Sequence, residues 1–329
     1  MISTDTAAGP RKSISSTLSQ IIQKVNPQRN GIPIIFVFLV IVFALLKPEF
    51  VNPSNLASIV RGSSVIGIIA VGMTLVMVGG GFDLSVARVA ALSGVVVGSL
   101  NQSGPLLAIG GTLLIAVGIG LTNGVLVTKA KVNPFVVTLG MMSIAGSLSL
   151  VVAGGETKRD FAPWLNNLAA GDIGPIPKVA IYFLIAAIVC HVLLAHTRFG
   201  RYVYAAGGNP EAARLAGIRV DRVIASTYVI VSLLSAIAGI VLVSRLQSAT
   251  SDILLGGELD AIAAVIIGGT RLGGGVGSVP RTVLGVLILA MLSNALILFG
   301  IDAFWQGALK GSVIIAAVAF DALSAKRRT

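Results

Sequence analysis

A few polar residues lie within or beside long apolar stretches, and they are the first candidates for chemistry in this chain. Amide and hydroxyl side chains can hydrogen-bond a hydroxyl-rich solute, and an aromatic ring can stack on one. Because fixed charges are scarce here, the set suits a neutral polar solute. Each side chain has an alternative role in helix packing or interfacial anchoring. The candidates are Asp83, Asn123, Thr138, Arg271, Asn294, Trp305 and Gln306.

Asp83 and Arg271 stand in similar surroundings. Residues 80–84 (GGFDL) can be laid over residues 268–272 (GGTRL), and an apolar run follows each. Glycine permits broken helices, and paired glycine-interrupted segments often flank a transport path. The superposition predicts an internal repeat of about four or five spans, in which Asp83 and Arg271 pair across the repeat interface. Chance similarity of two glycine-rich stretches is the alternative.

Several catalytic motifs are absent from the sequence. It contains no GxxxxGK[ST] P-loop for ATP, no HExxH and no GxSxG. Cys190 is the only cysteine, and His191 and His196 are too few to build a site. We therefore expect a chain that is not an enzyme and binds no cofactor or metal of its own. A self-contained secondary carrier or facilitator is the alternative, although only Asp83 and Asp260 stand near membrane depth to bind a coupling ion.

A polar island, GGNPEAARLAGIRVDRV at residues 207–223, separates two long apolar runs. Asn209 can cap the first free N–H groups, Pro210 suits the first helical position, and Glu211 favours the positive end of the helix dipole. Gly217 supplies a left-handed stop, so the sequence predicts a helix of about two turns. A helix with its own start and stop signals within a loop indicates an element that docks into a partner. An ordered linker is the alternative.

The elements that position these residues are helices in a membrane. The chain has 329 residues, 55% hydrophobic and 11% charged, with a mean hydropathy of +0.95. Runs of about 20 apolar residues can each cross a bilayer as a helix. We predict an all-α, polytopic transmembrane bundle with about ten spans and glycine-broken helices. The apolar segments are 32–46, 64–82, 84–100, 105–127, 134–153, 179–195, 224–243, 259–270, 282–299 and 306–323.

The distribution of charge predicts the topology. The net charge of +11 comes from lysines and arginines between apolar runs rather than from one basic face of the kind that binds nucleic acid. With ten spans most basic residues fall on one side, which the positive-inside rule makes cytoplasmic, together with both termini and residues 207–223. The predicted regions are a tail with an amphipathic helix (1–30), a transmembrane domain (31–324) and a basic C-terminus (325–329).

The longest loop on the other side, residues 154–178, contains Phe161 and Trp164 among several charged residues. It has two compatible interpretations. One is an interfacial helix anchored by its aromatic side chains at the lipid headgroups. The other is a docking surface for a protein outside the membrane.

Five separated motifs resemble the ribose/xylose-type permease subunits of bacterial ABC importers. The resemblance extends over nearly the whole chain after the N-terminal tail. The departure is at Ala87 and Arg88, where the family usually has a glycine in DLSVG. The motifs are GMTLVMVGGGFDLSVARVAALSG (72–94), NPFVVTLGMMSIAGSLSLVVAGG (133–155), TRFGRYVYAAGGNPEAARLAGIRVDRV (197–223), ELDAIAAVIIGGTRLGGGVGSV (258–279) and FWQGALKGSVIIAAVAFD (304–321).

The resemblance implies a multi-pass protein of the bacterial inner membrane that imports a monosaccharide, a ribose-like pentose or related sugar. It implies a second permease copy, a periplasmic sugar-binding protein, and an ABC ATPase with two domains or two copies that binds ATP and Mg²⁺. The stretch resembling the family's coupling signature would dock into that ATPase. Its residues are Asn209, Pro210, Glu211, Ala212, Ala213 and Gly217.

Overall fold

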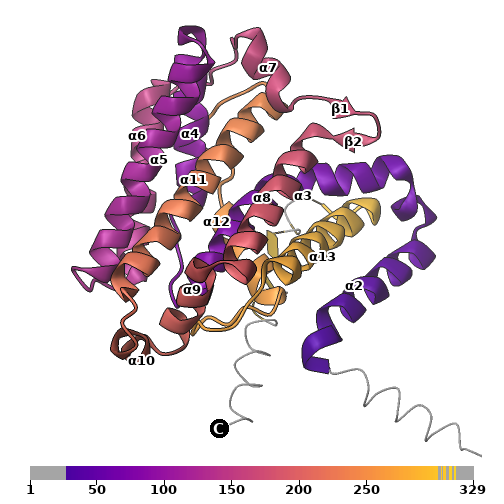
Figure 1. The fold of residues 1–329 in the computed structure, drawn as a ribbon. Coiled ribbons are helices and arrows are strands. Elements are labelled where there is room, and N and C mark those ends of the chain that lie inside the picture. Colours follow the sequence, from indigo (N-terminus) through magenta and orange to yellow (C-terminus); the bar gives the residue numbers. More distant parts are fainter. Residues whose placement is uncertain (1–26, 303–304, 306, 309–310, 313–314, 316–329) are drawn as a thin grey trace, which may run out of the picture.

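The computed structural model describes residues 27–302 and the single positions 305, 307, 308, 311, 312 and 315. Within them the chain is mostly helical, as predicted, with one short antiparallel hairpin (Figure 1). The amphipathic tail, Gln306, most of the tenth apolar segment and the basic C-terminus lie outside the described residues. The proposed region boundaries therefore remain predictions.

Proline sets where many helices begin, because its fixed φ suits the first turn and its missing N–H is not needed there. The first half of the described chain contains α2 (Pro27–Leu46), the 3-10 turn η1 (Pro48–Val51), α3 (Pro53–Val78), α4 (Val86–Leu100), the 3-10 turn η2 (Asn101–Ser103), α5 (Pro105–Thr128) and α6 (Pro134–Ala153). The second half contains α7 (Pro163–Ala169), β1 (Asp172–Ile173), β2 (Ile176–Pro177), α8 (Lys178–His196), α9 (Arg198–Gly208), α10 (Pro210–Leu215), α11 (Val220–Leu246), α12 (Gly257–Ile267) and α13 (Val279–Leu298).

In the part of the chain that the structure describes, six helices are long and apolar enough to cross a membrane, namely α3, α5, α6, α8, α11 and α13. The helices at the other predicted segments are shorter, with 15 residues in α4 and 11 in α12. The apolar part of α2 covers Gly31–Leu46. The polytopic helical class is therefore confirmed, while the count of ten spans stays a prediction.

The most deeply buried of the candidate spans are α3 and α11. In Figure 1, α4, α5 and α6 gather on one side of α11, while α2 lies at the opposite edge beside α13. Small residues allow the central helices to cross closely. A Cβ at Gly239 of α11 would lie 2.0 Å from the carbonyl oxygen of Ala90 in α4. Glycine at this crossing is thus a packing requirement.

The bundle has two distinct ends. One carries α7 and the β1–β2 hairpin, and we call it the α7 end; the other carries α9 and α10, and we call it the α10 end (Figure 1). At the α7 end, Phe161 is buried against Gly98, and the Trp164 indole N–H donates to the carbonyl of Asn101 at 3.0 Å. The expected loop helix is present as α7, but its aromatic neighbours pack into the protein rather than pointing out to headgroups.

Candidate functional site

The helix predicted in the polar island is α10, and its capping is as the sequence predicts. The Asn209 side chain accepts a hydrogen bond from the N–H of Ala212 at 3.0 Å, and Pro210 occupies the first turn. Gly217 has a φ of +81°, and the N–H groups of Gly217 and Ile218 close the last turn on Arg214 and Ala213. Local chemistry alone therefore defines this helix.

The helix α10 has one face on the bundle and one face free. Ala213 is 4% exposed and packs with Ala206 of α9 and Val220 of α11. Glu211 is exposed, and Leu215 is 90% exposed. A short helix that anchors one side and presents a carboxylate and a large apolar side chain on the other has the form of a docking element.

The preceding helix α9, which the sequence did not predict, ties α10 to the bundle. Its first turn is capped by Thr197, whose hydroxyl accepts from the N–H of Gly200. One turn before its end, the Tyr204 hydroxyl donates to the carbonyl of Gly277 at 2.7 Å. Burial raises the pKa of the Tyr204 phenol above its usual value.

Three chain segments cross at the end of α9 without side chains between them. We call this crossing the glycine junction; it comprises Gly80, Gly207, Gly208, Gly274 and Gly275, together with the carbonyl of Val78.

Three of the five junction glycines, Gly207, Gly274 and Gly275, have no space for a Cβ. The N–H of Gly275 donates to the carbonyl of Val78 at 2.8 Å. A Cβ at Gly207 would lie 1.9 Å from the oxygen of Val78, and a Cβ at Gly274 would lie 2.8 Å from the Cα of Gly80. The end of α9 is therefore in backbone contact with the turn after α3 and with the loop between α12 and α13.

The two glycine breaks that the sequence singled out share one geometry, but in a different register from the predicted one. After α3, the N–H groups of Gly79, Gly80 and Gly81 bond the carbonyls of Leu75, Met77 and Val76. After α12 the same pattern recurs: the N–H groups of residues 268, 269 and 270 donate to the carbonyls of residues 264, 266 and 265. Gly80 and Gly269 have φ of +86° and +80°. This alignment moves the two stretches by one residue, so Asp83 and Arg271 are not equivalent.

Asp83 lies in a closed polar cluster with Ser85 and Asn123. The Asp83 carboxylate is fully buried and accepts hydrogen bonds from the Ser85 N–H at 2.8 Å, from the Ser85 hydroxyl and from the Asn123 amide at 3.3 Å. Because Ser85 is the N-cap residue of α4, the positive end of that helix faces the carboxylate. Asn123 Oδ1 has no partner among the described residues. Two predicted candidates, Asp83 and Asn123, therefore meet.

Arg271 does not join this cluster. Its side chain is exposed in the loop after α12, and no ion pair joins it to another described residue. The predicted Asp83–Arg271 pair is thus absent from this structure. The carboxylate is stabilised instead by neutral donors and a helix terminus, which need no cation.

The remaining candidates lie apart from one another. Thr138 is buried and donates to the carbonyl of Pro134 one turn earlier. Asn294 exchanges two hydrogen bonds with Asn55, at 2.8 and 2.9 Å, and lines a cavity of about 290 Å³ between α3, α12 and α13. Trp305 is 66% exposed. The cavity that Asn294 lines contains none of the other predicted candidates.

One irregular segment, in the predicted connection between residues 243 and 259, was not singled out as a functional candidate. Residues 247–256, between α11 and α12, have no regular helix, and Leu254 has a φ of +65°. The guanidinium of Arg88 on α4 donates to the carbonyl of Ser251 at 3.0 Å. Irregular backbone between apolar helices is typical of a transport path. The signal in the sequence was the break in apolar character before α12, combined with an arginine in an apolar run.

Comparisons with known proteins agree over most of the chain. Residues 55–318 match the family described as branched-chain amino acid transport system, permease component. The ribose import permease of Bacillus subtilis is 42% identical over 287 residues, 86% of this chain and 89% of that protein. The L-arabinose permease of Azospirillum brasilense is 34% identical (89% of this chain, 87% of that protein), and the galactose/methyl galactoside import permease of Haemophilus influenzae is also 34% identical (90% and 94%). No solved structure matches the chain.

Proposed function

Because this chain belongs to the family of transport-system permease components, we propose that it is the inner-membrane subunit of an ABC importer for a monosaccharide, a ribose-like pentose or a related sugar. The similarity to ribose-type permeases, inferred from five motifs, is confirmed over most of the chain. It is a transport subunit rather than an enzyme. Permeases named for ribose, arabinose and galactose are 34–42% identical to it over the aligned residues, which supports a sugar as the solute.

The observation that carries this proposal is the link between α10 and the glycine junction. The free face of α10 presents Glu211 and Leu215 to a partner. Its other side continues into Gly207 and Gly208, which contact the turns that end α3 and precede α13. A movement imposed on α10 therefore reaches two membrane helices through backbone contacts rather than through flexible side chains.

In the proposed cycle, an ABC ATPase with two domains or two copies binds ATP and Mg²⁺, and α10 docks into it. Closure of the ATPase displaces α10 together with α9, whose first turn is capped by Thr197 and whose Tyr204 bonds the loop before α13 at Gly277. The glycine junction passes the displacement to the ends of α3 and α12. The membrane helices then exchange between inward-open and outward-open states, and the ligand-bound ATPase biases that equilibrium.

We infer ten spans, with both termini and the α10 end in the cytoplasm. Basic residues concentrated at the α10 end support this orientation. They include Lys129, Lys131, Arg198, Arg201, Arg214, Arg219 and Arg222. The short helices α4 and α12 count as spans because each follows or precedes a broken stretch, as in transporters built from inverted repeats. We infer a repeat from the contact that the break after α3 and the loop after α12 both make with the end of α9.

A periplasmic sugar-binding protein would then meet the α7 end, where α7 and the hairpin lie. There the Arg61 guanidinium contacts both oxygens of Asp172, at 2.7 and 2.9 Å, which fixes the hairpin on α3. A second copy of the permease would complete the path. The exposed apolar face of α6, with Leu139, Ile144 and Val151, is a surface for such a neighbour.

The test is to extract the tagged chain from its native membrane in mild detergent and identify what stays bound. We expect a P-loop ATPase at comparable abundance, and we expect Glu211→Ala and Gly217→Val to lose it while still inserting into the membrane. Glu156→Ala, an exposed glutamate in the loop before α7, is the matched control and should retain it. If the chain is purified alone yet moves sugar in liposomes without ATP, it is instead a self-contained carrier.

A further inference from the structure

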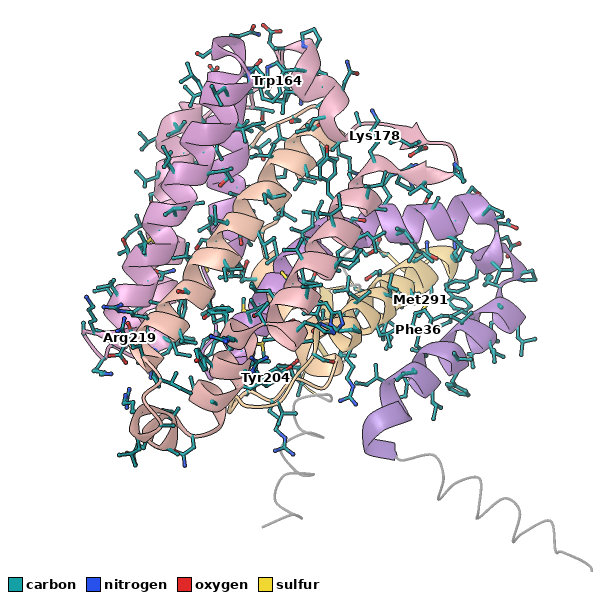
Figure 2. The ribbon with its side chains drawn as sticks, in the orientation of Figure 1. Phe36, Trp164, Lys178, Tyr204, Arg219 and Met291 are labelled. Carbon is teal, nitrogen blue, oxygen red and sulfur yellow. The ribbon has the colours of Figure 1, made fainter. Side chains whose placement is uncertain are left out.

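A cavity of about 390 Å³ lies beside α10, between the end of α5 and the start of α11. We call it the basic cavity. Four cations line it, and Asp221 is its single acid; the cations are Lys129, Arg214, Arg219 and Arg222. Figure 2 labels Arg219 at the lower left, where nitrogen-bearing side chains gather near the turn from α5 to α6.

The positive charge of the basic cavity is largely uncompensated. Asp221 Oδ1 is shared by two cations, with Arg214 at 3.3 Å and Lys131 at 3.4 Å. Lys129, Arg219 and Arg222 form no ion pair among the described residues, and all three are exposed. Several like charges held around one concave space repel one another, so the arrangement favours an anion between them.

The backbone adds to this field. Arg219 is the N-cap residue of α11, and no side chain caps that helix. The helix is 27 residues long, and its positive end lies beside the cavity. A helix N-terminus together with guanidinium and ammonium groups favours binding of a phosphate.

The location identifies the source of the phosphate. Lys129 is the first residue after α5, and Arg219 is the last before α11; both helices are candidate spans. The cavity is therefore at the depth of the lipid headgroups. One turn before Lys129, Val125 and Leu126 are 41% and 38% exposed and provide an apolar surface for acyl chains.

We propose that the basic cavity binds the phosphate of an anionic phospholipid headgroup, with Lys129, Arg219 and Arg222 as its principal contacts. The bound lipid would join the end of α5, the start of α11 and, through Arg214, the end of α10. It would thereby hold the base of α10 against the bundle while the opposite face of α10 stays free for a partner. Basic pockets between spans on the cytoplasmic side favour such headgroups.

The experiment measures binding of fluorescent dioleoyl phosphatidylglycerol to the purified full chain in detergent. Arg219→Gln/Arg222→Gln should bind it roughly thirtyfold more weakly, since each basic residue near an anionic surface contributes about 1 kcal/mol, or roughly fivefold. The control Arg198→Gln/Arg201→Gln removes the same charge from exposed positions on α9 and should change binding less than about twofold. Lys129→Gln alone should weaken binding about fivefold, which tests the same cavity with a milder change.

Four outcomes would overturn the proposal. The first is equal binding by the wild type and the Arg219/Arg222 double variant. The second is equal binding of phosphatidylcholine, whose headgroup is neutral overall. The third is displacement of the lipid by inorganic phosphate at a matched concentration and ionic strength, which would make this a free-phosphate site. The fourth is displacement by the copurifying ATPase, which would make the cavity part of a protein interface.

Discussion

The breaks after α3 and after α12 end their helices in the same way and then diverge. Both use a glycine with positive φ and the same three backbone hydrogen bonds. The chain after α3 then turns inward and buries Asp83 and Ser85 completely, whereas the chain after α12 runs outward and exposes Arg271. Glycine thus determines where a helix stops, and the following residues determine whether the turn holds a charge inside the protein or leaves it in solvent.

The hydrogen-bond pattern by itself is weak proof of a repeat. The end of α13 has the same pattern, because the N–H groups of residues 299, 300 and 301 donate to the carbonyls of residues 295, 297 and 296. Gly300 there has a φ of +72°. The first two cases differ from that third case because the break after α3 and the loop that follows the break after α12, at Gly274 and Gly275, both meet the end of α9 in the glycine junction. Their shared contact, rather than their shared termination, is what relates them functionally.

The largest expected effect comes from filling the contact that joins the two breaks. Gly207→Ala would place a Cβ 1.9 Å from the carbonyl oxygen of Val78, so the backbone must move. ATP-driven sugar uptake in proteoliposomes that contain the ATPase partner should fall about tenfold or more. Gly208→Ala is the matched control, because its Cβ would meet nothing nearer than 3.9 Å. Equal uptake by the two variants would remove the junction from the mechanism.

The next effect compares how much the buried turn after α3 and the exposed turn after α12 each contribute to stability. Asp83→Ala leaves the Ser85 and Asn123 donors buried without their acceptor, which should lower the free energy of unfolding by about 2–4 kcal/mol. Arg271→Ala, on the exposed turn, should change it by less than about 0.5 kcal/mol. The measurement is denaturant unfolding of both variants in the same detergent, and a similar loss in both would contradict the difference described here.

A smaller effect tests whether the two terminations are equivalent. Gly80 and Gly269 have nearly the same left-handed φ, and an alanine at either should cost about 1–2 kcal/mol of stability. The Cβ at 269 would meet only a terminal atom of Ile32, at 3.1 Å, which can move. Thermal unfolding of Gly80→Ala and Gly269→Ala should therefore show similar shifts; a shift in one alone would mean that the breaks already differ at the glycine.

The smallest expected effect concerns the pair predicted from the sequence. Since Asp83 and Arg271 do not meet, Asp83→Asn and Arg271→Gln should be additive within about 0.5 kcal/mol in a double-mutant cycle. The charge-swapped double variant should likewise be no more active than the weaker single variant. Rescue by the swap would show that the two residues pair in another state of the transport cycle.

Local signals predicted the structure best where a few neighbouring residues decide it. The cap at Asn209, the proline at 210 and the left-handed Gly217 all act within one short helix, and the structure contains each of them. The break at residues 79–81 was located for the same reason. These features depend on backbone geometry that a residue type imposes wherever it stands.

Long-range partners were not readable from the sequence. Asp83 was expected to find a cation and instead found Ser85, two residues away, and Asn123 on α5. The junction glycines were recognised as helix breakers but not as neighbours of one another. A glycine has no side chain, so its residue type does not indicate what it contacts. Tyr204 and Arg88 were missed as links for the same reason, since each bonds a backbone carbonyl, which every residue possesses.

The deep burial of α3 has a consequence for how the protein is made. Its neighbours α8, α11, α12 and α13 all follow it in the chain. At a synthesis rate of about 5–20 residues per second, the roughly 220 residues between the ends of α3 and α13 take about 10–40 s to appear. Until then Thr74 has the carbonyl of Ala70 but lacks Thr282, its partner at 2.7 Å in the folded bundle. The central helix α3 is thus inserted early, and its last packing partner arrives late. In a nascent chain stalled before α13, lipid or the insertion machinery covers the face of α3 that α13 would bury.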